Sequence, residues 1–478
     1  MVKARGKLPR QPLVSVVIPT KNAGPRFQDT LEAISHQAGG WPWEVIMIDS
    51  GSSDETLTIG RSYGAQVVSI PPSAFNHGDT RNEGIRRARG EYVILLVQDA
   101  VPANQYWLGA LVETLQQDPR AAGAYSRHLA RPDDDYLSRY VAEFWHRQVG
   151  GRQVQEIADP VAFQRLPWIS QCSRCAFNNV SAIIRRSVWQ KHPFPRVNYA
   201  EDMAWAKEVL AAGYRIIYEP ESMVLHTHRR PALYELRRAF VDARALATLF
   251  SWPGQPLSVP QAEALLRYFE AESSLADSAL ADNGESAAVP ALAEAFCQGE
   301  DWYRAHFDRL ALRHLLGAAS LQSEADRRYL LAGLDRRERL NALRDGARAD
   351  AGHPPISSRL EQGLAAGQVS PEDLAFVFNT LWWELGRDYA RQAVLSALQD
   401  QPADPLDDVQ REQRSFADVV LRGALATGSL TYPLYWRVRL YAAAWAIGRR
   451  LGLASLAPSD PAEEPYWQNL VERWTPGI

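Results

Sequence analysis

Residues 14–20 of this 478-residue chain read VSVVIPT, a run rich in β-branched residues that carries no charged side chain. Apolar residues stand on both faces of such a run, which is typical of a strand in a sheet covered by helices on both sides. We expect this first strand at 13–19, with further strands at 44–49, 66–70, 92–98, 215–219 and 223–226. Helical patterns separate them at 26–37, 54–63, 80–89, 105–117 and 202–212. This alternation predicts an α/β domain.

After about residue 230 the strand pattern ends, and Ala, Leu and Arg recur at helical spacing. Helices are expected at 323–345 and 370–398, each with capping residues at its start. Earlier in the chain, Ser52 and Glu55 have the spacing of a capping box for the helix at 54–63. Three prolines and a glycine at 251–260 indicate a linker. We therefore predict a tail at 1–12, an α/β domain at 13–250, a linker at 251–260 and a mainly α-helical domain at 261–478, with a further break near 401–409.

Composition narrows the class of protein. Apolar residues make up 46% and charged residues 23% of the chain, which excludes a disordered chain, a collagen-like chain and a coiled-coil rod. The net charge of −4 argues against a protein that binds nucleic acid through bulk charge. Three cysteines fit a reducing compartment. The longest strongly apolar run, at 92–97, is far shorter than the roughly 20 residues that span a bilayer, and the basic N-terminus lacks the apolar segment of a secretory signal. We predict a cytoplasmic location.

The segment 432–453 combines aromatic residues with arginines at positions 437, 439, 449 and 450. One interpretation is a helix that packs into a core and keeps a solvated arginine edge. The other is an interfacial helix that holds the protein against anionic lipid, peripherally on the inner face of the cytoplasmic membrane.

Polar side chains follow several of the predicted strands. Ligands of an open α/β sheet bind beyond the carboxyl ends of its strands, so Asp49 and Asp99 are expected to face one cleft. His226 and His228 lie two apart in an extended run and point to the same face. A strand-end carboxylate can bind a hard divalent cation and leave positions open for diphosphate oxygens. Neither the dinucleotide fingerprint nor the P-loop motif is present, which argues against NAD-dependent and P-loop chemistry.

The motifs that surround these residues resemble a known family. VSVVIPT at 14–20, followed by IDSGSSD at 48–54, resembles the nucleotide-binding half of the family 2 inverting glycosyltransferases, which have the GT-A fold, a Rossmann-like mixed sheet flanked by helices. The bacterial rhamnosyltransferase branch is suggested by six further motifs: FNHGDTRN at 75–82, QDA at 98–100, FNNVSA at 177–182, ED at 201–202, YEP at 218–220 and HTH at 226–228. The resemblance covers about residues 13–245 and does not extend into the helical half.

The resemblance implies a role for each matching position on the nucleotide side. Asp49 would contact the nucleobase, and Thr20 and Asn22 would line the same pocket. Gln98 would lie beside the nucleotide, in the place where the family's D-x-D motif has its first aspartate. Arg81 would help to neutralise the diphosphate of the donor.

The resemblance also implies the metal and catalytic residues. Asp99 would bind Mg²⁺ or Mn²⁺ at the donor diphosphate, and His226 or His228 would be a further metal or phosphate ligand. Asp202 would be the catalytic base. Three more residues are expected to line the pocket for the donor or acceptor sugar: Trp168, Asn178 and Glu201.

Several of these residues also have a purely structural interpretation. Arg81 could pair with Glu83 or Asp79, and Trp168 could belong to the hydrophobic core. His226 and His228 could be ordinary buried or surface histidines.

The reaction explains why these residue types are needed. A diphosphate departs as the sugar is transferred, so a divalent cation and an arginine stabilise the charge that develops. The acceptor hydroxyl attacks from the opposite face, and a carboxylate must take its proton. Asp202 begins a helix whose dipole favours the ionised form that a base needs. One base without a protein nucleophile gives a single displacement with inversion.

We therefore expect an enzyme that transfers L-rhamnose from dTDP-L-rhamnose to a bacterial surface polysaccharide or a lipid-linked oligosaccharide. The first alternative is the same reaction with UDP-galactose, UDP-GlcNAc or another hexose donor. The second alternative is a nucleotide-sugar-binding scaffold without catalysis, which the glutamine at position 98 keeps open.

Overall fold

The computed structural model describes residues 11–251, 255–281, 335, 338, 354–366, 405–427, 429 and 432–475. The chain divides into two compact units, the first formed by Met1–Ser273, Val409–Ser429 and Leu434–Ile478, and the second by Ser274–Asp408 and Leu430–Pro433. The predicted helix at 370–398 lies outside the described residues. Of the helix predicted at 323–345, only residues 335 and 338 are described, and both are helical. The predicted domain boundaries stay a prediction. The predicted linker at 251–260 lies inside the first unit.

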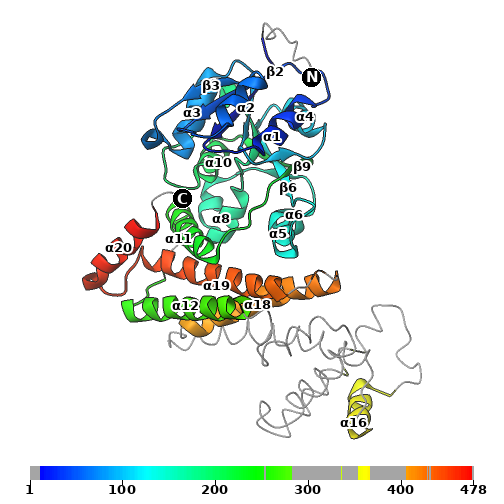
Figure 1. The fold of residues 1–478 in the computed structure, drawn as a ribbon, viewed down its shortest axis with the longest axis vertical. Coiled ribbons are helices and arrows are strands. Elements are labelled where there is room, and N and C mark those ends of the chain that lie inside the picture. The colour runs from blue at the N-terminus through cyan, green and yellow to red at the C-terminus, as the bar shows by residue number, and fades with distance from the viewer. Residues whose placement is uncertain are drawn as a thin grey trace. The chain divides into compact units, whose positions relative to one another are not determined.

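The first unit contains a mixed sheet whose order is β3-β2-β1-β4-β8-β6-β9-β5, with β7 paired to β9 (Figure 1). Parallel strands form one half: β1 (Val14–Thr20), β2 (Trp43–Asp49), β3 (Gln66–Ser69) and β4 (Tyr92–Leu96). The other half contains β5 (Val101–Pro102), β6 (Ala121–Leu129), β7 (Gln153–Gln155), β8 (Ser181–Arg185) and β9 (Arg215–Leu225). Strand β8 is antiparallel to both β4 and β6, while β6 and β9 are parallel. The predicted α/β fold with a mixed sheet is confirmed.

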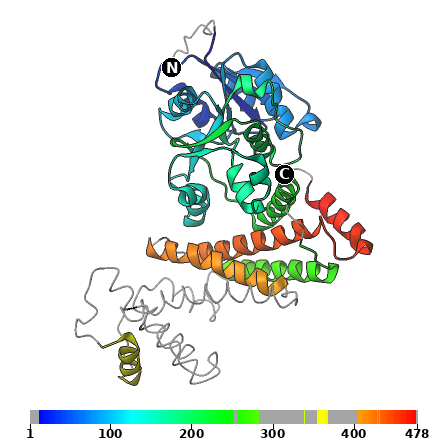
Figure 2. The same cartoon turned by 180° about the vertical axis from the view of Figure 1, so that it is seen from behind.

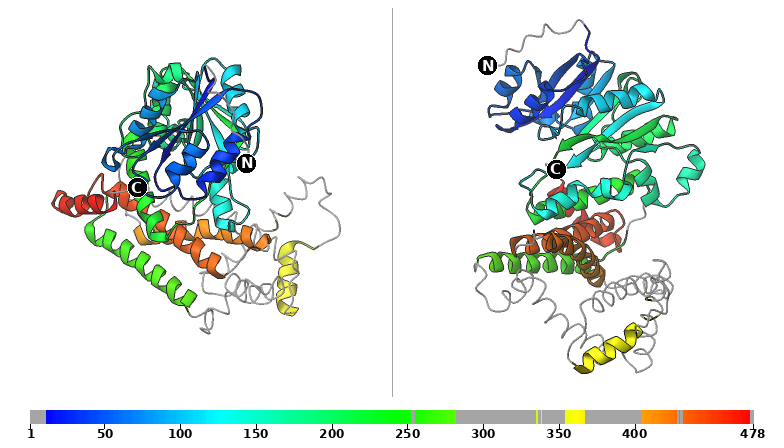
Figure 3. Two further views of the ribbon diagram at one scale, coloured as in Figure 1. Left: turned by 45° about the horizontal axis from the view of Figure 1, so that its top comes forward. Right: turned by 90° about the vertical axis from the view of Figure 1, so that its right-hand side faces the viewer.

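Helices cover both faces of this sheet, as the apolar strands require. One core lies under α1 (Phe27–Ser35) and α4 (Trp107–Gln117), where Val16 and Ile18 of β1 pack. The other lies under α3 (His77–Arg87) and α10 (Glu201–Ala211), where Val17 packs. Figure 3 shows the twisted sheet between these layers from two further directions. Successive residues of one strand thus enter opposite cores, and the sheet is buried on both sides.

Two local expectations differ from the structure. The runs at 215–219 and 223–226 belong to one strand, β9, because a shift in its pairing with β6 after Ser126 accommodates the intervening residues. The capping box of Ser52 and Glu55 does not form. Helix α2 (Thr56–Ser62) begins after Glu55, and the Asp54 carboxylate accepts the Thr56 backbone N–H at 3.1 Å instead.

Short helices connect the second half of the sheet. They are α5 (Tyr136–Ala142), α6 (Phe144–Val149), α7 (Pro160–Gln164), α8 (Trp168–Arg174) and α9 (Arg186–Trp189). In the first half, the 3₁₀ turn η1 (Pro72–Ala74) lies between β3 and α3. Helix α16 (Ile356–Ala366) belongs to the second unit.

The described residues contain further helices: α11 (Ala232–Leu249), α12 (Val259–Ala281), α18 (Pro405–Ala426), α19 (Tyr432–Ala454) and α20 (Glu464–Trp474), which follows the 3₁₀ turn η2 (Pro461–Glu463). Helices α12, α18 and α19 lie side by side (Figures 1 and 2). Helix α19 approaches α11 very closely, because a Cβ added at Gly448 or Gly452 would come within 2.4 Å of a backbone carbonyl oxygen of α11. The close packing of these two helices therefore requires both glycines.

The arginines of α19 are paired with carboxylates. Arg439 lies 2.8 Å from Glu272, both Arg449 and Arg450 bind Glu412, and Arg437 pairs with Asp135. Its described apolar side chains include five that are buried: Leu434, Trp436, Val438, Ile447 and Leu451. These contacts support the packing interpretation of 432–453, because the buried apolar side chains and the paired arginines both have partners within the protein. The interfacial interpretation stays a prediction.

Among the described residues, no helix is both long and apolar enough to cross a lipid bilayer.

Candidate active site

A cluster of one carboxylate and two imidazoles forms where β5 pairs with β9. Val101 lies opposite Leu225 in this antiparallel pair, so continuing the register places Asp99 opposite residue 227, between His226 and His228. The Nε2 atom of His226 lies 3.6 Å and that of His228 3.5 Å from the Asp99 carboxylate. The two Nε2 atoms are 3.1 Å apart. Short strand pairing thus brings together three residues that sequence reasoning had selected as metal ligands.

The chemistry of this cluster fits a divalent cation. Burial lowers the pKa of His226 well below its usual value, and burial together with the nearby Arg230 lowers that of His228. Neutral imidazoles have a free lone pair on one ring nitrogen, as metal ligation requires. Ligand atoms of the three residues all lie within 4.8 Å of one another. Asp99, His226 and His228 can therefore supply one oxygen and two nitrogens to one ion.

A third histidine packs behind the cluster. The ring of His128, on β6, meets the His226 ring edge-on with centroids 5.6 Å apart. Burial lowers the pKa of His128 to about 4, and its Nε2 atom is buried without a hydrogen-bond partner. The sequence reasoning missed this residue because it did not identify β6, whose alanine-rich start lacks a strand pattern.

Asp202 lies in the first turn of α10. This helix begins directly after Ala200, which has a left-handed backbone with φ of 59°. Its carboxyl group accepts hydrogen bonds from the backbone N–H of Met203 at 2.8 Å and of Asn179 at 3.3 Å. Burial, with the neighbouring Glu201 charge, raises its pKa to about 7. The helix N-terminus favours the ionised form through the Met203 N–H, as expected, but burial and the Glu201 charge outweigh it.

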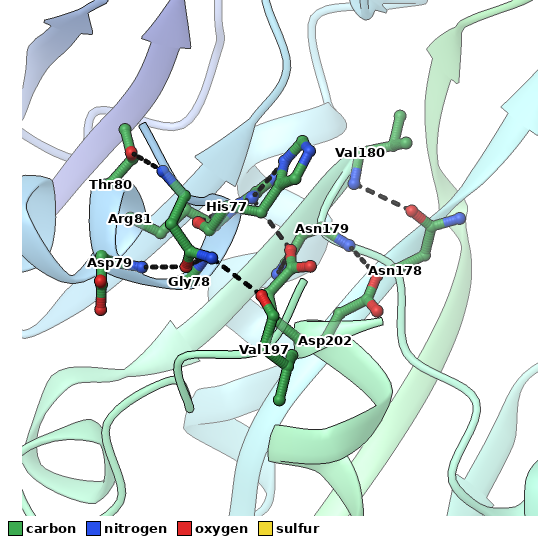
Figure 4. A network of polar contacts seen from close by, with 12 residues as sticks. His77, Gly78, Asp79, Thr80, Arg81, Asn178, Asn179, Val180, Val197 and Asp202 are labelled. Atoms are coloured by element: carbon green, nitrogen blue, oxygen red, sulfur yellow. Dashed lines mark hydrogen bonds and ion pairs between the residues drawn. The ribbon is translucent and has the colours of Figure 1, made fainter. Parts of the chain in front are cut away.

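The adjacent carboxylate, Glu201, has the opposite environment. Figure 4 shows Arg81, Asn179 and Asp202 in one network of polar contacts. Its Oε1 atom accepts hydrogen bonds from the Arg81 guanidinium at 2.9 Å and from the Asn179 amide at 3.2 Å. Burial acts to raise the pKa of Glu201, but Arg81 and His77 outweigh it and hold the pKa below its usual value. Two neighbouring carboxyl groups thus have pKa values displaced in opposite directions, an arrangement typical of acid–base sites.

Arg81 is committed to this ion pair. The side chains of Arg81 and Glu201 are only 6% and 8% exposed, and Arg81 also donates to the His77 carbonyl at 3.0 Å. The expected pairing with Glu83 or Asp79 is wrong, because Glu83 binds Arg86 and Arg87 while Asp79 binds Arg196. The geometry gives Arg81 a direct part in holding the Glu201 carboxylate.

Thr20, Asn22 and Asp49, the three residues expected at the nucleobase, belong to one hydrogen-bond network beyond β1 and β2. The buried Asp49 carboxylate accepts hydrogen bonds from the Thr20 hydroxyl at 3.1 Å and from the backbone N–H groups of Gly51 and Ser52 at 3.0 and 2.9 Å. Asn22, with φ of 47°, accepts from the Ser53 backbone N–H at 2.8 Å. These contacts order the turn after each strand.

Gln98 bridges two strand ends. Its Oε1 atom accepts from the Lys21 backbone N–H at 2.8 Å, and its Nε2 atom donates to the Lys21 carbonyl at 3.2 Å. An aspartate could accept but could not donate, so only an amide makes both bonds. This bridge explains physically why glutamine stands at this position.

Asn178 and Trp168 differ in their surroundings. Asn178 accepts from the Val180 backbone N–H at 2.9 Å, and the Val97 backbone N–H donates to the Val180 carbonyl at 3.0 Å, which places Asn178 near the end of β4. Trp168 is half-buried at the start of α8 and packs against the core beneath α10.

The sequence did not reveal the role of Asn179, although the FNN motif contains it. A single amide that supports two carboxyl groups has no sequence pattern of its own.

Comparisons with known proteins agree with this fold. Residues 15–166 match the family Glycosyl transferase family 2. The O-antigen chain rhamnosyltransferase WbaN of Salmonella anatum is 30% identical over 233 residues, which cover 48% of this chain and 70% of that protein. The O-antigen chain rhamnosyltransferase RfbN of Salmonella typhimurium is 29% identical over 231 residues, with the same coverage.

A solved structure of a mannosyltransferase from Pyrobaculum calidifontis, in complex with GDP-Man and Mn²⁺, is also similar, at 20% identity and a TM-score of 0.37. The similarity covers 64% of this chain and 87% of that one. The mixed sheet, together with the family match and the two rhamnosyltransferases, defines a glycosyltransferase of the GT-A fold. The chain belongs to glycosyl transferase family 2.

Replacing Arg81 by Gln is expected to destabilise the protein by about 3 kcal/mol, because a buried carboxylate that loses its ion-pair partner is left uncompensated. Urea unfolding measures this loss. The matched control is Arg86→Gln in the same helix, whose pair with Glu83 is largely exposed and should contribute less than about 1 kcal/mol. Equal losses in the two variants would contradict the role of the Arg81–Glu201 pair.

Proposed function

We propose that this protein transfers L-rhamnose from dTDP-L-rhamnose to a hydroxyl of a bacterial surface saccharide, by a single displacement that inverts the anomeric centre. The similarity to two O-antigen chain rhamnosyltransferases supports the choice of sugar. A growing polysaccharide or a lipid-linked oligosaccharide is the proposed acceptor. A lipid-linked acceptor would bring the protein to the inner face of the cytoplasmic membrane.

The observation that carries this proposal is the contrast between Glu201 and Asp202. Arg81 keeps Glu201 ionised. Burial raises the pKa of Asp202, and the charge on Glu201 raises it further. A base is most effective when its pKa lies near the working pH, because it is then both ionised and basic enough to take a proton. We assign the removal of the acceptor proton to Asp202. Glu201 and Asn179 position this group and need not touch the sugar.

Asp99, His226 and His228 would hold the divalent cation. When bound, a divalent cation neutralises charge on the departing diphosphate. The two nitrogen ligands favour Mn²⁺ over Mg²⁺, because Mg²⁺ is bound mainly by oxygen ligands while imidazole suits transition metals. His128 and the surrounding burial keep His226 neutral and therefore able to bind the ion.

The nucleotide would bind beyond β1 and β2. Asp49 would face the base, with Thr20 and Asn22 forming the rest of that pocket. Gln98 would act through its bridge to Lys21, which fixes the loop beside the nucleotide. Asn178 and Trp168 remain candidates for the sugar pocket, and Asn178 is the better placed because it lies near the end of β4.

Replacing Asp202 by Asn should reduce transfer by about a hundredfold or more, the usual contribution of a positioned base, while donor binding changes little. Steady-state kinetics and calorimetric titration with the donor separate the two effects. The control is Asp79→Asn, which removes an aspartate whose partner Arg196 is exposed. Unchanged turnover in Asp202→Asn would remove Asp202 from the catalytic role.

The pH dependence of kcat/KM should reflect the raised pKa of Asp202. A carboxylate base with a pKa of about 7 is protonated below that pH, so the rate should fall by about tenfold per pH unit on the acid side and level off above it. Circular dichroism over the same range checks that the protein stays folded. A profile that is flat between pH 6 and 8 would contradict the assignment.

A donor panel tests the proposed function directly. The protein is incubated with Mn²⁺ and dTDP-L-rhamnose, UDP-galactose or UDP-GlcNAc, and release of the nucleoside diphosphate is measured with Asp99→Ala as the blank. We expect turnover with dTDP-L-rhamnose and little with either UDP-sugar. Turnover with a UDP-sugar alone would reject the rhamnosyl proposal, and binding without turnover of any donor would favour the non-catalytic scaffold.

A further inference from the structure

The loop at 131–135, which we call the support loop, contacts both halves of the proposed metal site. It follows β6 and leads into α5. The Arg131 guanidinium donates to the Asp99 carbonyl oxygen at 2.8 Å. The Asp134 carboxylate accepts from the Arg131 backbone N–H at 2.7 Å and from the hydroxyl of Thr227, the residue between the two histidines. The support loop therefore fixes the backbone of Asp99 and the side chain of Thr227 together.

Three consecutive aspartates, Asp133–Asp135, give the support loop a strong negative charge. Asp134 is only 9% exposed, so water screens its charge poorly. Arg229 offsets part of this charge, because its guanidinium donates to the Asp133 carbonyl at 2.8 Å and lies 3.9 Å from the Asp135 carboxylate. Like charges so close together need further cations to keep one conformation.

The second cation comes from the far end of the sequence. Arg437 of α19 pairs with the Asp135 carboxylate and donates to the Ser138 hydroxyl at 3.1 Å. Asp135 also caps α5, since it accepts the Ser138 backbone N–H at 2.9 Å. Helix α5 packs on the same group of helices, because the rings of Tyr140 and Phe416 meet edge-on with centroids 5.9 Å apart. All of these residues belong to the first unit.

We propose that Arg437 is a positioning residue for the metal site. It holds the support loop, which in turn holds Asp99 through Arg131 and the two histidines through Asp134 and Thr227. Without Arg437, repulsion between Asp134 and Asp135 loosens the loop, and the three ligands lose their fixed separation. This inference rests on the proposed metal site and assigns a task to a helix outside the part of the chain that resembles the family.

Binding of Mn²⁺ to the full-length, nucleotide-free protein tests the proposal without reference to activity. Electron paramagnetic resonance of free Mn²⁺ gives the dissociation constant. Arg437→Gln should weaken binding by about tenfold, as is usual when a residue that supports metal ligands is lost. Arg437→Lys keeps the charge but not the two-pronged geometry and should restore part of the affinity. The control Arg449→Gln, on the same helix but paired with Glu412, should bind as the parent protein does.

A double-mutant cycle tests the route through the support loop. Thr227→Val removes the hydroxyl that binds Asp134, and it should also weaken Mn²⁺ binding. If both residues act through the loop, the double variant of Thr227→Val and Arg437→Gln should bind Mn²⁺ almost as well as the single variant with the lower affinity. Additive losses would show that Arg437 acts elsewhere and would overturn the proposal. Should Arg437→Gln fail to fold, Arg437→Met, which keeps an apolar stem and removes the charge, takes its place in both measurements.

The parent protein and Asp99→Ala separate this inference from the proposed site itself. If the two bind Mn²⁺ equally, the metal site is wrong. If Asp99→Ala loses binding while folded Arg437→Gln binds as the parent protein does, the metal site stands and only the role of Arg437 is rejected.

Discussion

The pairing of β9 with its neighbours is the constraint on which the site depends. This strand is parallel to β6 and antiparallel to β5 and β7, so it joins segments that are far apart in the sequence. A two-residue ladder with β5 is enough to place Asp99 between two histidines more than a hundred residues later. A slip of one residue would exchange the faces of the strand and separate the three side chains.

The second feature of the site is that one ion pair sets the chemistry of its neighbour. Arg81 and Asn179 stabilise the charge on Glu201, and that charge opposes ionisation of Asp202. Burial alone would raise the pKa of both carboxyl groups. Two residues that are adjacent in sequence thus differ in chemistry because only Glu201 forms an ion pair with Arg81. Arg81, whose predicted contact with the donor diphosphate stays a prediction, binds this carboxylate.

The sequence predicted the parallel half of the sheet well, because β1, β2 and β4 are apolar on both faces and are followed by polar turns. It did not reveal β6 and β8, since alanine-rich and five-residue strands lack a pattern that differs from a helix or a loop. The cluster of Asp99, His226 and His228 was predicted because its residues carry a recognisable chemistry at strand ends. Arg437 and the support loop were not, because a link between residues 135 and 437 exists only after folding. The Gln98 bridge was not predicted either, because its contact with Lys21 also exists only after folding.

The path of the chain between the two units has a consequence for variation among related proteins. The chain leaves the first unit after Ser273, within α12, and returns to it at Val409, within α18, so most of the second unit is an insertion into the sequence of the first. The helices that follow the return, including α19 with its two close-packed glycines, complete the support of the catalytic sheet. Length and sequence can therefore change within the insertion at little cost to the sheet, whereas a chain that ended before the return point would lose a structural part of its catalytic unit.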